Sequence, residues 1–219
     1  MEVSMEDRSN KNDDTKERLI GAAGEMFAQH GFRSATVRKI CSRAGAHVGA
    51  VNYHFRNKEG LYAAVLEHSH QSAVRKYPPD LGLREEATAE EKLRAFIHSL
   101  LLRILDKRIP SWHGKLMIRE CSDPTNALNQ VVQNSIRPLV TYLQSILREL
   151  INGGKTAEKE ESEMIFLCAM SIVGQCLHYF TGRQVIAALR PKSFDPADIE
   201  RIADHVMRFS LGGVRGYKS

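Results

Sequence analysis

Apolar residues recur every three or four positions along most of the chain, which is the spacing of one face of an α-helix. The first such run contains Leu19, Ala23, Met26 and Phe27 and stops at Gly31. Glycines, prolines and polar capping residues separate the runs, and no segment alternates with the period of a β-strand. The pattern predicts an all-α fold of about nine helices.

Short helices follow the first run. Thr36 is a typical N-cap for a second helix, and Gly45 is a typical stop after it. A third short helix is expected in the segment that ends at Phe55. Asn57 then caps a fourth helix that continues toward Tyr77, where two prolines end it.

The second half of the chain also predicts helices. Thr88 and Glu91 form a capping box ahead of a run of apolar residues, and a shorter helix is expected around Trp112–Cys121. Asp123 and Pro124 have the spacing of a cap and a first-turn proline.

The later elements carry similar signals. Pro138 should kink or split the helix that Gly153 and Gly154 close. Thr156 is expected to cap a long apolar helix, and Asp195–Pro196 to begin the last one. These signals predict a disordered tail (1–13), an N-terminal domain (14–77), a linker (78–88) and a C-terminal domain (89–215).

The segment Met164–Phe180 is apolar on nearly every face. It is too short to span a membrane comfortably and it contains Gln175 and His178, so we expect no membrane partner. Such a helix is usually buried on more than one side, and a second copy of the chain would cover the side that its own domain leaves open. The sequence therefore predicts a homodimer. The candidate interface residues are Ile172, Cys176, Phe180 and Val206.

Composition is that of a soluble globular protein. The chain has 219 residues, of which 42% are hydrophobic and 26% charged, with a net charge of +5. The N-terminus lacks the apolar core of a signal peptide. The four cysteines form no C-x-x-C pair and follow no metal-ligand spacing, so we expect reduced thiols, a cytoplasmic location and no metal.

The segment Thr36–Phe55 has the layout of a helix-turn-helix motif. Its second helix has a slim outer face made of His47, Val48, Gly49, Ala50 and Asn52. A slim face fits the major groove of DNA, which is about 12 Å wide, and an asparagine there can pair with adenine. The segment is therefore a candidate for reading base sequence.

Groups suited to phosphate surround this face. They are the hydroxyl of Thr36, the side chains of Tyr53 and His54, and Lys58 at the next helix start. Five basic residues add positive charge: Arg33, Arg38, Lys39, Arg43 and Arg56. No acidic residue lies between Phe32 and Lys58, so the local charge favours a polyanion.

The run TVRKI-x3-AG-x3-G-x-VNYHF-x-NKEGL, which begins at Thr36, resembles the TetR family of bacterial transcriptional regulators. The resemblance covers roughly residues 13–73. It implies a three-helix DNA-binding head, a larger helical body for ligand binding and dimerisation, and repression relieved by a small molecule. With a twofold dimer, the DNA partner would be a palindromic operator.

Carried over by position, the resemblance makes Thr36 and Lys58 phosphate contacts. It makes the recognition surface from seven residues: His47, Val48, Gly49, Ala50, Asn52, Tyr53 and His54. Many members have tyrosine at the position of Asn52 and a second aromatic residue after it. Here Tyr53 would take the backbone contact and Asn52 would read a base, and the assignment of Asn52 stays open. A looser run from Glu120 resembles the CecR-like branch of the family.

Several polar groups lie within apolar helical segments of the body, as a ligand pocket requires. The candidate pocket residues are His98, Trp112, Arg119, Gln175 and His178, with Arg103 and Glu120 in the same class. Polar groups satisfied in the core or at the surface give the same pattern. The sequence does not identify the effector.

Other functions are less well supported. His47 and His54 lie seven positions apart with no cysteine or acid beside them, which disfavours a metal site. There is no nucleophile–base motif, phosphate loop or H-E-x-x-H, so we expect neither a cofactor nor an enzyme. A ligand-released repressor is the leading interpretation. An activator or ligand-independent regulator with the same head, and more remotely an all-α enzyme, remain as alternatives.

Overall fold

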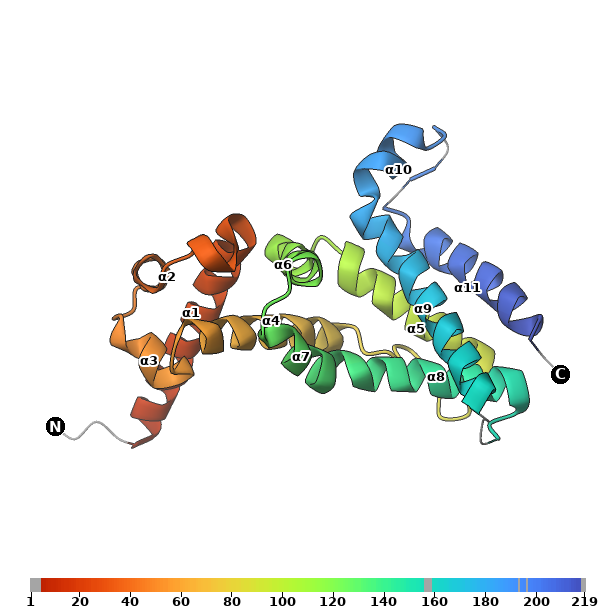
Figure 1. Ribbon diagram of the computed structural model, residues 1–219, viewed down its shortest axis with the longest axis horizontal. Coiled ribbons are helices and arrows are strands. Elements are labelled where there is room, and N and C mark those ends of the chain that lie inside the picture. The colour runs from red at the N-terminus through yellow and green to blue at the C-terminus, as the bar shows by residue number, and fades with distance from the viewer. Residues whose placement is uncertain (1–4, 156–158, 193, 196, 218–219) are drawn as a thin grey trace. The chain divides into compact units, whose positions relative to one another are not determined.

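The computed structural model describes residues 5–155, 159–192, 194–195 and 197–217, and these residues form helices and connecting turns with no strand (Figure 1). The all-α prediction is confirmed. The helices are α1 (Met5–Ser34), α2 (Val37–Ala44), α3 (Gly49–Phe55), α4 (Lys58–Lys76), α5 (Ala89–Leu105), α6 (Ser111–Ser122), α7 (Ala127–Val131), the π-helical turn η1 (Val132–Ile136), α8 (Arg137–Asn152), α9 (Lys159–Thr181), α10 (Arg183–Leu189) and α11 (Ile199–Arg215).

The chain forms two compact units. The first unit contains Met1–Ser72 and Pro110–Ser135, and the second contains Ala73–Ile109 and Ile136–Ser219. The sequence had assigned α6 and α7 to the C-terminal domain, whereas the structure groups them with the N-terminal helices. The physical reason is packing, because α6 lies against α1.

The α1–α6 crossing is close because Gly24 has no side chain. A Cβ atom at Gly24 would lie 2.7 Å from the indole of Trp112. Gly31 interrupts α1 with a φ of 77° and a ψ of 167°, as its predicted role as a stop requires. These two glycines shape the first unit: one admits α6, and the other redirects the chain toward α2.

Buried polar groups also hold α4 and α6 together. The hydroxyl of Tyr62 donates to Glu120 at 2.7 Å, and the backbone N–H and hydroxyl of Thr125 donate to the same carboxylate at 2.8 Å. Glu120 has no solvent exposure. Farther along the same two helices, Ser69 shares a hydrogen bond with Nδ1 of His113. This satisfied polar layer makes the position of α6 on α4 specific.

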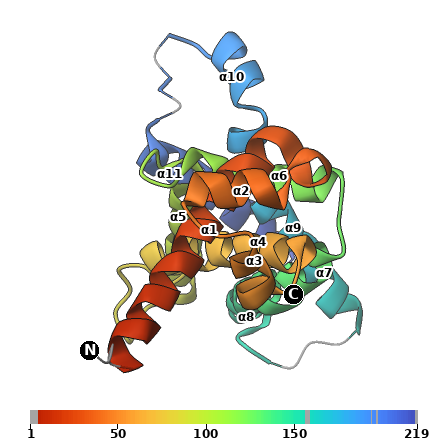
Figure 2. The same cartoon turned by 90° about the vertical axis from the view of Figure 1, so that its left-hand side faces the viewer.

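The second unit is built around α5, which packs against α8, α9 and α11. Thr88 and Glu91 form the predicted capping box, with the Thr88 hydroxyl accepting from the Glu91 N–H at 3.3 Å. The core consists of one apolar face from each of these helices. Figure 2 gives a second view in which α10 again stands apart from the helices of this core.

Several predicted helix boundaries need correction. Residues 5–13 belong to α1, although the sequence suggested a disordered tail, and residues 1–4 lie outside the described residues. Asp123 is the C-cap of α6, and the next helix begins at Ala127. Pro138 lies in the first turn of α8 after η1, so the predicted split is confirmed.

The C-terminal helices differ in a similar way. Asp198 caps α11 by accepting from the Arg201 N–H at 3.0 Å. The expected start at Asp195–Pro196 is therefore wrong, and Pro196 itself lies outside the described residues. So does Thr156, the expected cap of α9. The short helix α10 was not predicted.

The apolar helix α9 is long and apolar enough to cross a membrane by length and composition alone, a property that core helices of soluble proteins share. One face of α9 packs in the core of the second unit. Three of the predicted dimer residues, Ile172, Cys176 and Val206, lie in that core with at most 2% exposure. They cannot form an intermolecular seam. Phe180 is half-buried.

Candidate nucleic-acid interface

Helices α2 and α3 and the turn between them form the predicted helix-turn-helix motif. The Thr36 hydroxyl caps α2 by accepting from the Lys39 N–H at 3.4 Å. Gly45 ends α2 with a φ of 60°, and the following N–H of Ala46 donates to the Cys41 carbonyl at 2.9 Å. A left-handed residue at this position is accommodated most easily by glycine.

The inner faces of α2 and α3 are apolar and buried. Ile40 and Ala44 of α2 are buried, and so are Val51 and Phe55 of α3. These four side chains belong to the core of the first unit, which both helices share with α1. Burial of one face fixes which residues of α3 point outward.

The turn into α3 supplies its own cap. Nδ1 of His47 accepts a hydrogen bond from the Gly49 N–H at 3.2 Å, and the His47 carbonyl accepts from the Ala50 N–H at 2.9 Å. His47 therefore orients the first turn of α3, and it also lies on the exposed face.

The outer face of α3 is open to solvent. Tyr53 is 74% exposed and Val48 is 45% exposed, and His47, Gly49 and Asn52 are exposed as well. Ala50 and His54 are half-buried. The ring of Tyr53 meets that of His54 edge-on, with centroids 4.9 Å apart. A face with this mixture of small, amide and aromatic groups is narrow enough to enter a major groove.

The end of α3 is held against the start of α4. A Cβ atom at Gly60 would lie 2.0 Å from the Phe55 carbonyl oxygen, so only glycine fits there. The Asn57 side chain accepts from the Gly60 N–H at 2.8 Å, which confirms its predicted role as the cap of α4. Arg56, between the two helices, has a φ of 70°. This close junction restricts the angle between α3 and α4.

The basic side chains of the motif differ in whether they already have a partner within the protein. Nζ of Lys58 donates to the Arg33 carbonyl at 3.2 Å and lies 4.6 Å from the centre of the Phe32 ring. Arg43 forms an ion pair with Glu25 of α1, so part of its charge is neutralised.

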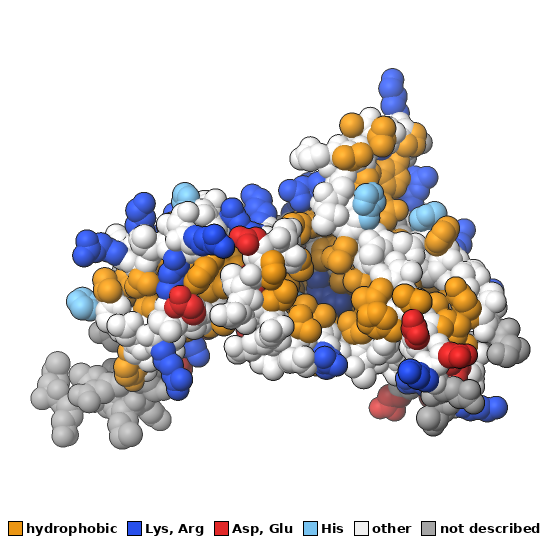
Figure 3. All heavy atoms as spheres, in the orientation of Figure 1, with side chains coloured by type: hydrophobic (Ala, Val, Ile, Leu, Met, Phe, Trp, Pro, Cys, Tyr) orange, Lys and Arg blue, Asp and Glu red, His pale blue; other side chains and the backbone are white. Residues whose placement is uncertain are grey.

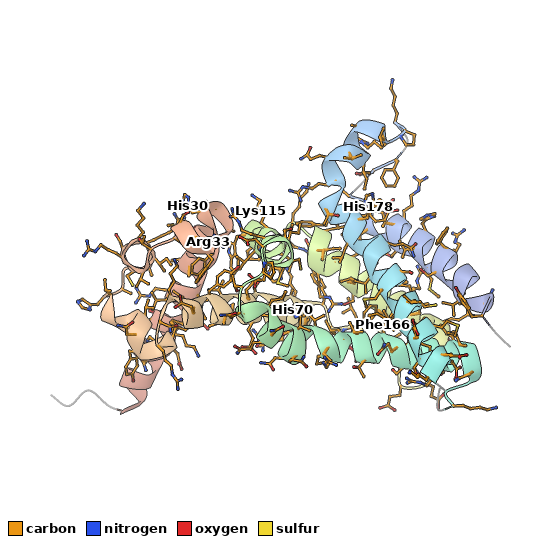
Figure 4. The ribbon with its side chains drawn as sticks, viewed as in Figure 1. His30, Arg33, His70, Lys115, Phe166 and His178 are labelled. Carbon is orange, nitrogen blue, oxygen red and sulfur yellow. The ribbon has the colours of Figure 1, made fainter. Side chains whose placement is uncertain are left out.

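Four basic side chains are exposed and make no ion pair within the described part of the chain: Arg33, Arg38, Lys39 and Arg56. Figure 3 shows Lys and Arg side chains spread over the visible face of the first unit, and Figure 4 labels His30 and Arg33 in the last turns of α1. These free cations give the motif its positive potential.

One contributor to the motif was not found from the sequence. Arg18 of α1 donates to the Ala44 carbonyl at 3.0 Å and to the Gly45 carbonyl at 3.5 Å. It therefore holds the C-terminal end of α2, where the chain turns toward α3. An arginine in an amphipathic helix carries no local signal for such a contact, since its two acceptors lie 26 and 27 residues away.

The five candidate ligand residues are divided between the two units. Trp112 and Arg119 belong to the first unit, where Arg119 donates to the Phe27 and Ala28 carbonyls at 3.5 and 3.4 Å. In the second unit, His98 pairs with Glu200 at 2.9 Å. His178 is exposed and lies close to Gly182. That these residues contact a ligand stays a prediction.

The fifth residue, Gln175, lines a groove of about 460 Å³ between α9 and α11. Its side chain donates to the Ser210 hydroxyl at 3.3 Å. Leu167 is 57% exposed and Phe209 is 66% exposed at this groove. Phe166, labelled with His178 on α9 in Figure 4, is exposed on the same helix. Large apolar groups left open on two adjacent helices are typical of an interaction surface.

Chemistry other than binding has little support in the described residues. No group of three or more His, Cys, Asp or Glu side chains there could hold a metal ion. All four cysteines are free thiols, and burial raises the pKa of each, most for Cys176, to about 12.

Two family models match the chain. Residues 19–65 match the bacterial regulatory proteins of the tetR family, and residues 89–214 match the C-terminal domain of the HTH-type transcriptional dual regulator CecR. The protein belongs to the TetR family of transcriptional regulators and has a C-terminal domain of the CecR type. It is a DNA-binding regulator, as the helix-turn-helix motif predicted, and this is not a family of enzymes.

Individual relatives agree with this assignment. The chain is 29% identical to CecR of Shigella flexneri over 184 residues, 80% of each chain. It is 25% identical to the transcriptional repressor NicS of Pseudomonas putida over 216 residues, 96% of each chain.

The fold is shared with solved structures. A transcriptional regulator from Pseudomonas aeruginosa PAO1 superposes with a TM-score of 0.67 at 24% identity, covering 93% of each chain. FadR of Bacillus subtilis, solved in complex with stearoyl-CoA, superposes with a TM-score of 0.63 at 21% identity, covering 90% of this chain and 98% of FadR.

Proposed function

We propose that the protein is a cytoplasmic repressor that binds a palindromic operator as a homodimer and leaves it when a small molecule binds the second unit. The observation that carries the DNA-binding part is the outer face of α3, which combines exposed His47, Asn52 and Tyr53 with small residues. The relatives support repression and ligand response, since NicS is described as a repressor and FadR was solved with stearoyl-CoA.

The proposal assigns roles to the candidate residues. Thr36, Arg38 and Lys58 contact phosphates, Tyr53 contacts the DNA backbone, and Asn52 reads a base. His47, Val48, Gly49, Ala50 and His54 complete the recognition surface. Phosphate contacts set affinity and register, whereas contacts to base edges set sequence preference. The four free thiols and the DNA partner fit the cytoplasm.

The homodimer is proposed to form through the exposed sides of α9 and α11. A single major-groove helix reads only a few base pairs, so two copies about 34 Å apart are needed for a specific site. The exposed groove at Leu167 and Phe209 supplies an apolar surface on one side of both helices. This face replaces Ile172, Cys176 and Val206 as the proposed seam.

An activator with the same head is the second candidate, because CecR is described as a dual regulator. A reporter gene placed downstream of the operator distinguishes repression from activation. Deleting the gene for this protein should raise reporter expression if the protein represses, and should lower it if the protein activates.

Selection of bound DNA fragments by the pure protein tests the recognition surface. Lys58→Ala should weaken binding to all fragments alike, because a phosphate contact carries no sequence information. Asn52→Ala should instead relax preference at one position of each half-site, costing about 1–3 kcal/mol there. Base-by-base profiles of Asn52→Ala identical to those of the unmodified protein would contradict the base-reading role of Asn52.

A further inference from the structure

The core of the second unit contains an arginine that the DNA-binding function does not use. Arg103 lies in the last turn of α5 and is only 5% exposed. Its guanidinium lies 6.0 Å from the centre of the Phe96 ring, two turns back along the same helix, so the side chain runs over the inner face of α5. Phe96 is itself 2% exposed.

None of the three guanidinium nitrogens of Arg103 has a hydrogen-bond partner, and none is open to solvent. Arg103 also makes no ion pair with any described acid. Burying an unpaired charge costs several kcal/mol. Burial lowers the pKa of Arg103 to about 10, so the group stays charged at neutral pH.

The neighbours of Arg103 cannot supply the missing negative charge. Cys176 of α9 lies close enough to interact with it, but burial raises the pKa of that thiol to about 12, so Cys176 is neutral. Asp106, the next acidic residue along the chain, is engaged with Tyr77 and Arg108. The Phe96 ring offers only a weak cation–π contact at this distance.

We propose that Arg103 is the anchor for the oxyanion of an amphipathic small molecule, with a carboxylate or phosphate head and an apolar body. This inference rests on the proposed function, since that molecule would be its effector. The planar guanidinium has five donors in a fork that matches a carboxylate or phosphate with two parallel hydrogen bonds. The surrounding core is apolar, which suits the rest of such a molecule.

Because Arg103 is enclosed, binding of an oxyanion requires a change in the conformation of the second unit. Because its nitrogens have no access to solvent, an oxyanion reaches them only when the side chain turns or when α5 moves against its neighbours. The ligand therefore binds a second arrangement of this unit better than the one described here. Such differential affinity is what a ligand needs in order to shift a conformational equilibrium.

Thermal unfolding of the full-length protein with matched probes tests the proposal. Decanoate and decyl phosphate carry the two candidate heads, 1-decanol has the same apolar body without charge, and inorganic phosphate has the charge alone. We expect decanoate or decyl phosphate to raise Tm well beyond decanol or inorganic phosphate, and the stronger of the two identifies the head group.

Variants at one position separate a ligand role from a structural one. R103M should raise the Tm of the ligand-free protein, because it removes a buried unpaired charge, and should weaken binding of the oxyanion probe about ten- to hundredfold. R103K, which keeps the charge but loses the fork, should bind the probe with intermediate affinity. R94M removes an exposed arginine from the same helix and should leave probe binding unchanged.

Equal shifts with decanoate, decyl phosphate and decanol would overturn the proposal. So would an R103M protein with lowered Tm and unchanged probe binding, since Arg103 would then be structural. Operator binding with and without the probe is measured in parallel. Probe binding that depends on Arg103 while operator affinity stays constant would support the site and contradict the effector role in the proposed function.

Discussion

Gly60 occupies a position at the end of the recognition motif where no side chain fits. Gly60→Ala would bring a Cβ atom to 2.0 Å from the Phe55 carbonyl, so the backbone of α3 or α4 must shift. We expect the free energy of unfolding to fall by about 1–3 kcal/mol, measured by urea titration.

Gly21→Ala is the matched control for this substitution. It lies in α1 with nothing within 4 Å of the new Cβ, and alanine is the better helix former. That variant should be as stable as the unmodified protein or up to about 1 kcal/mol more stable. Equal effects of the two substitutions would show that the contact at Phe55 does not constrain the motif.

His113 makes stability depend on pH. Burial, with a smaller contribution from the charge of His68, lowers its pKa to about 4, below the 6.5 of an unperturbed histidine. The unfolded chain therefore binds a proton between pH 6.5 and 4 that the folded chain does not bind. The stabilisation is complete above pH 6.5 and is lost as the pH falls toward 4, by up to about 3 kcal/mol.

Urea titrations across this pH range test the role of His113. His113→Gln keeps a group able to bond to Ser69 but does not titrate, so its stability should fall less between pH 6.5 and 4. His205→Gln, at an exposed position, should keep the full pH dependence. Identical pH dependence in both variants would assign the effect to other groups.

Single residues were predictable where their role is local. Thr36, Gly45 and Asn57 begin or end helices through contacts and backbone angles within a few positions. Their residue types therefore predict a cap or a stop. Arg103 has a role that depends on atoms placed by the tertiary fold. Arginine is common in ordinary helices, so no local signal separates Arg103 from the rest.

At the scale of elements, α2 is held in place by a side chain from α1. Arg18→Met removes the bonds to the Ala44 and Gly45 carbonyls, together with exposed contacts to Asp14 and Thr15. The loss should cost about 0.5–1.5 kcal/mol of stability. Because the turn into α3 then loses a support, affinity for all DNA sequences should fall together, as fluorescence anisotropy would report.

Lys16→Met provides the control for Arg18→Met. It removes one positive charge from an exposed position of the same helix. If both variants lose equal DNA affinity, Arg18 acts through its charge alone and not through the end of α2. If only Arg18→Met loses affinity, the support of the turn is the cause.

The faces of α9 show why some element-level predictions failed. A helix that is apolar on nearly every face has no polar side to mark the solvent. Its sequence therefore does not indicate which side packs against its own domain. The structure places Ile172 and Cys176 inside and leaves Leu167 outside. By contrast, α3 has a buried face of Val51 and Phe55 opposite polar residues, and its orientation was predicted correctly.

For the whole molecule, the proposed dimer makes a direct prediction. Leu167→Glu places a charge on the exposed groove of α9 and α11 and should produce monomers at micromolar concentration, where the unmodified protein has twice the mass of one chain by light scattering. Leu189→Glu changes an even more exposed leucine on α10, outside the groove, and should stay dimeric. A monomeric mass for the unmodified protein would contradict the proposed assembly.

The grouping of α6 and α7 with α1 sets a limit on recombination between family members. The chain passes from one unit to the other after Ser72, after Ile109 and after Ser135. A chimera joined only at the prolines after Tyr77 would give α1 a foreign α6, with a different side chain where Trp112 meets Gly24. An exchangeable DNA-binding unit therefore consists of two separate segments of sequence. A gene fusion with a single junction would transfer only one of them.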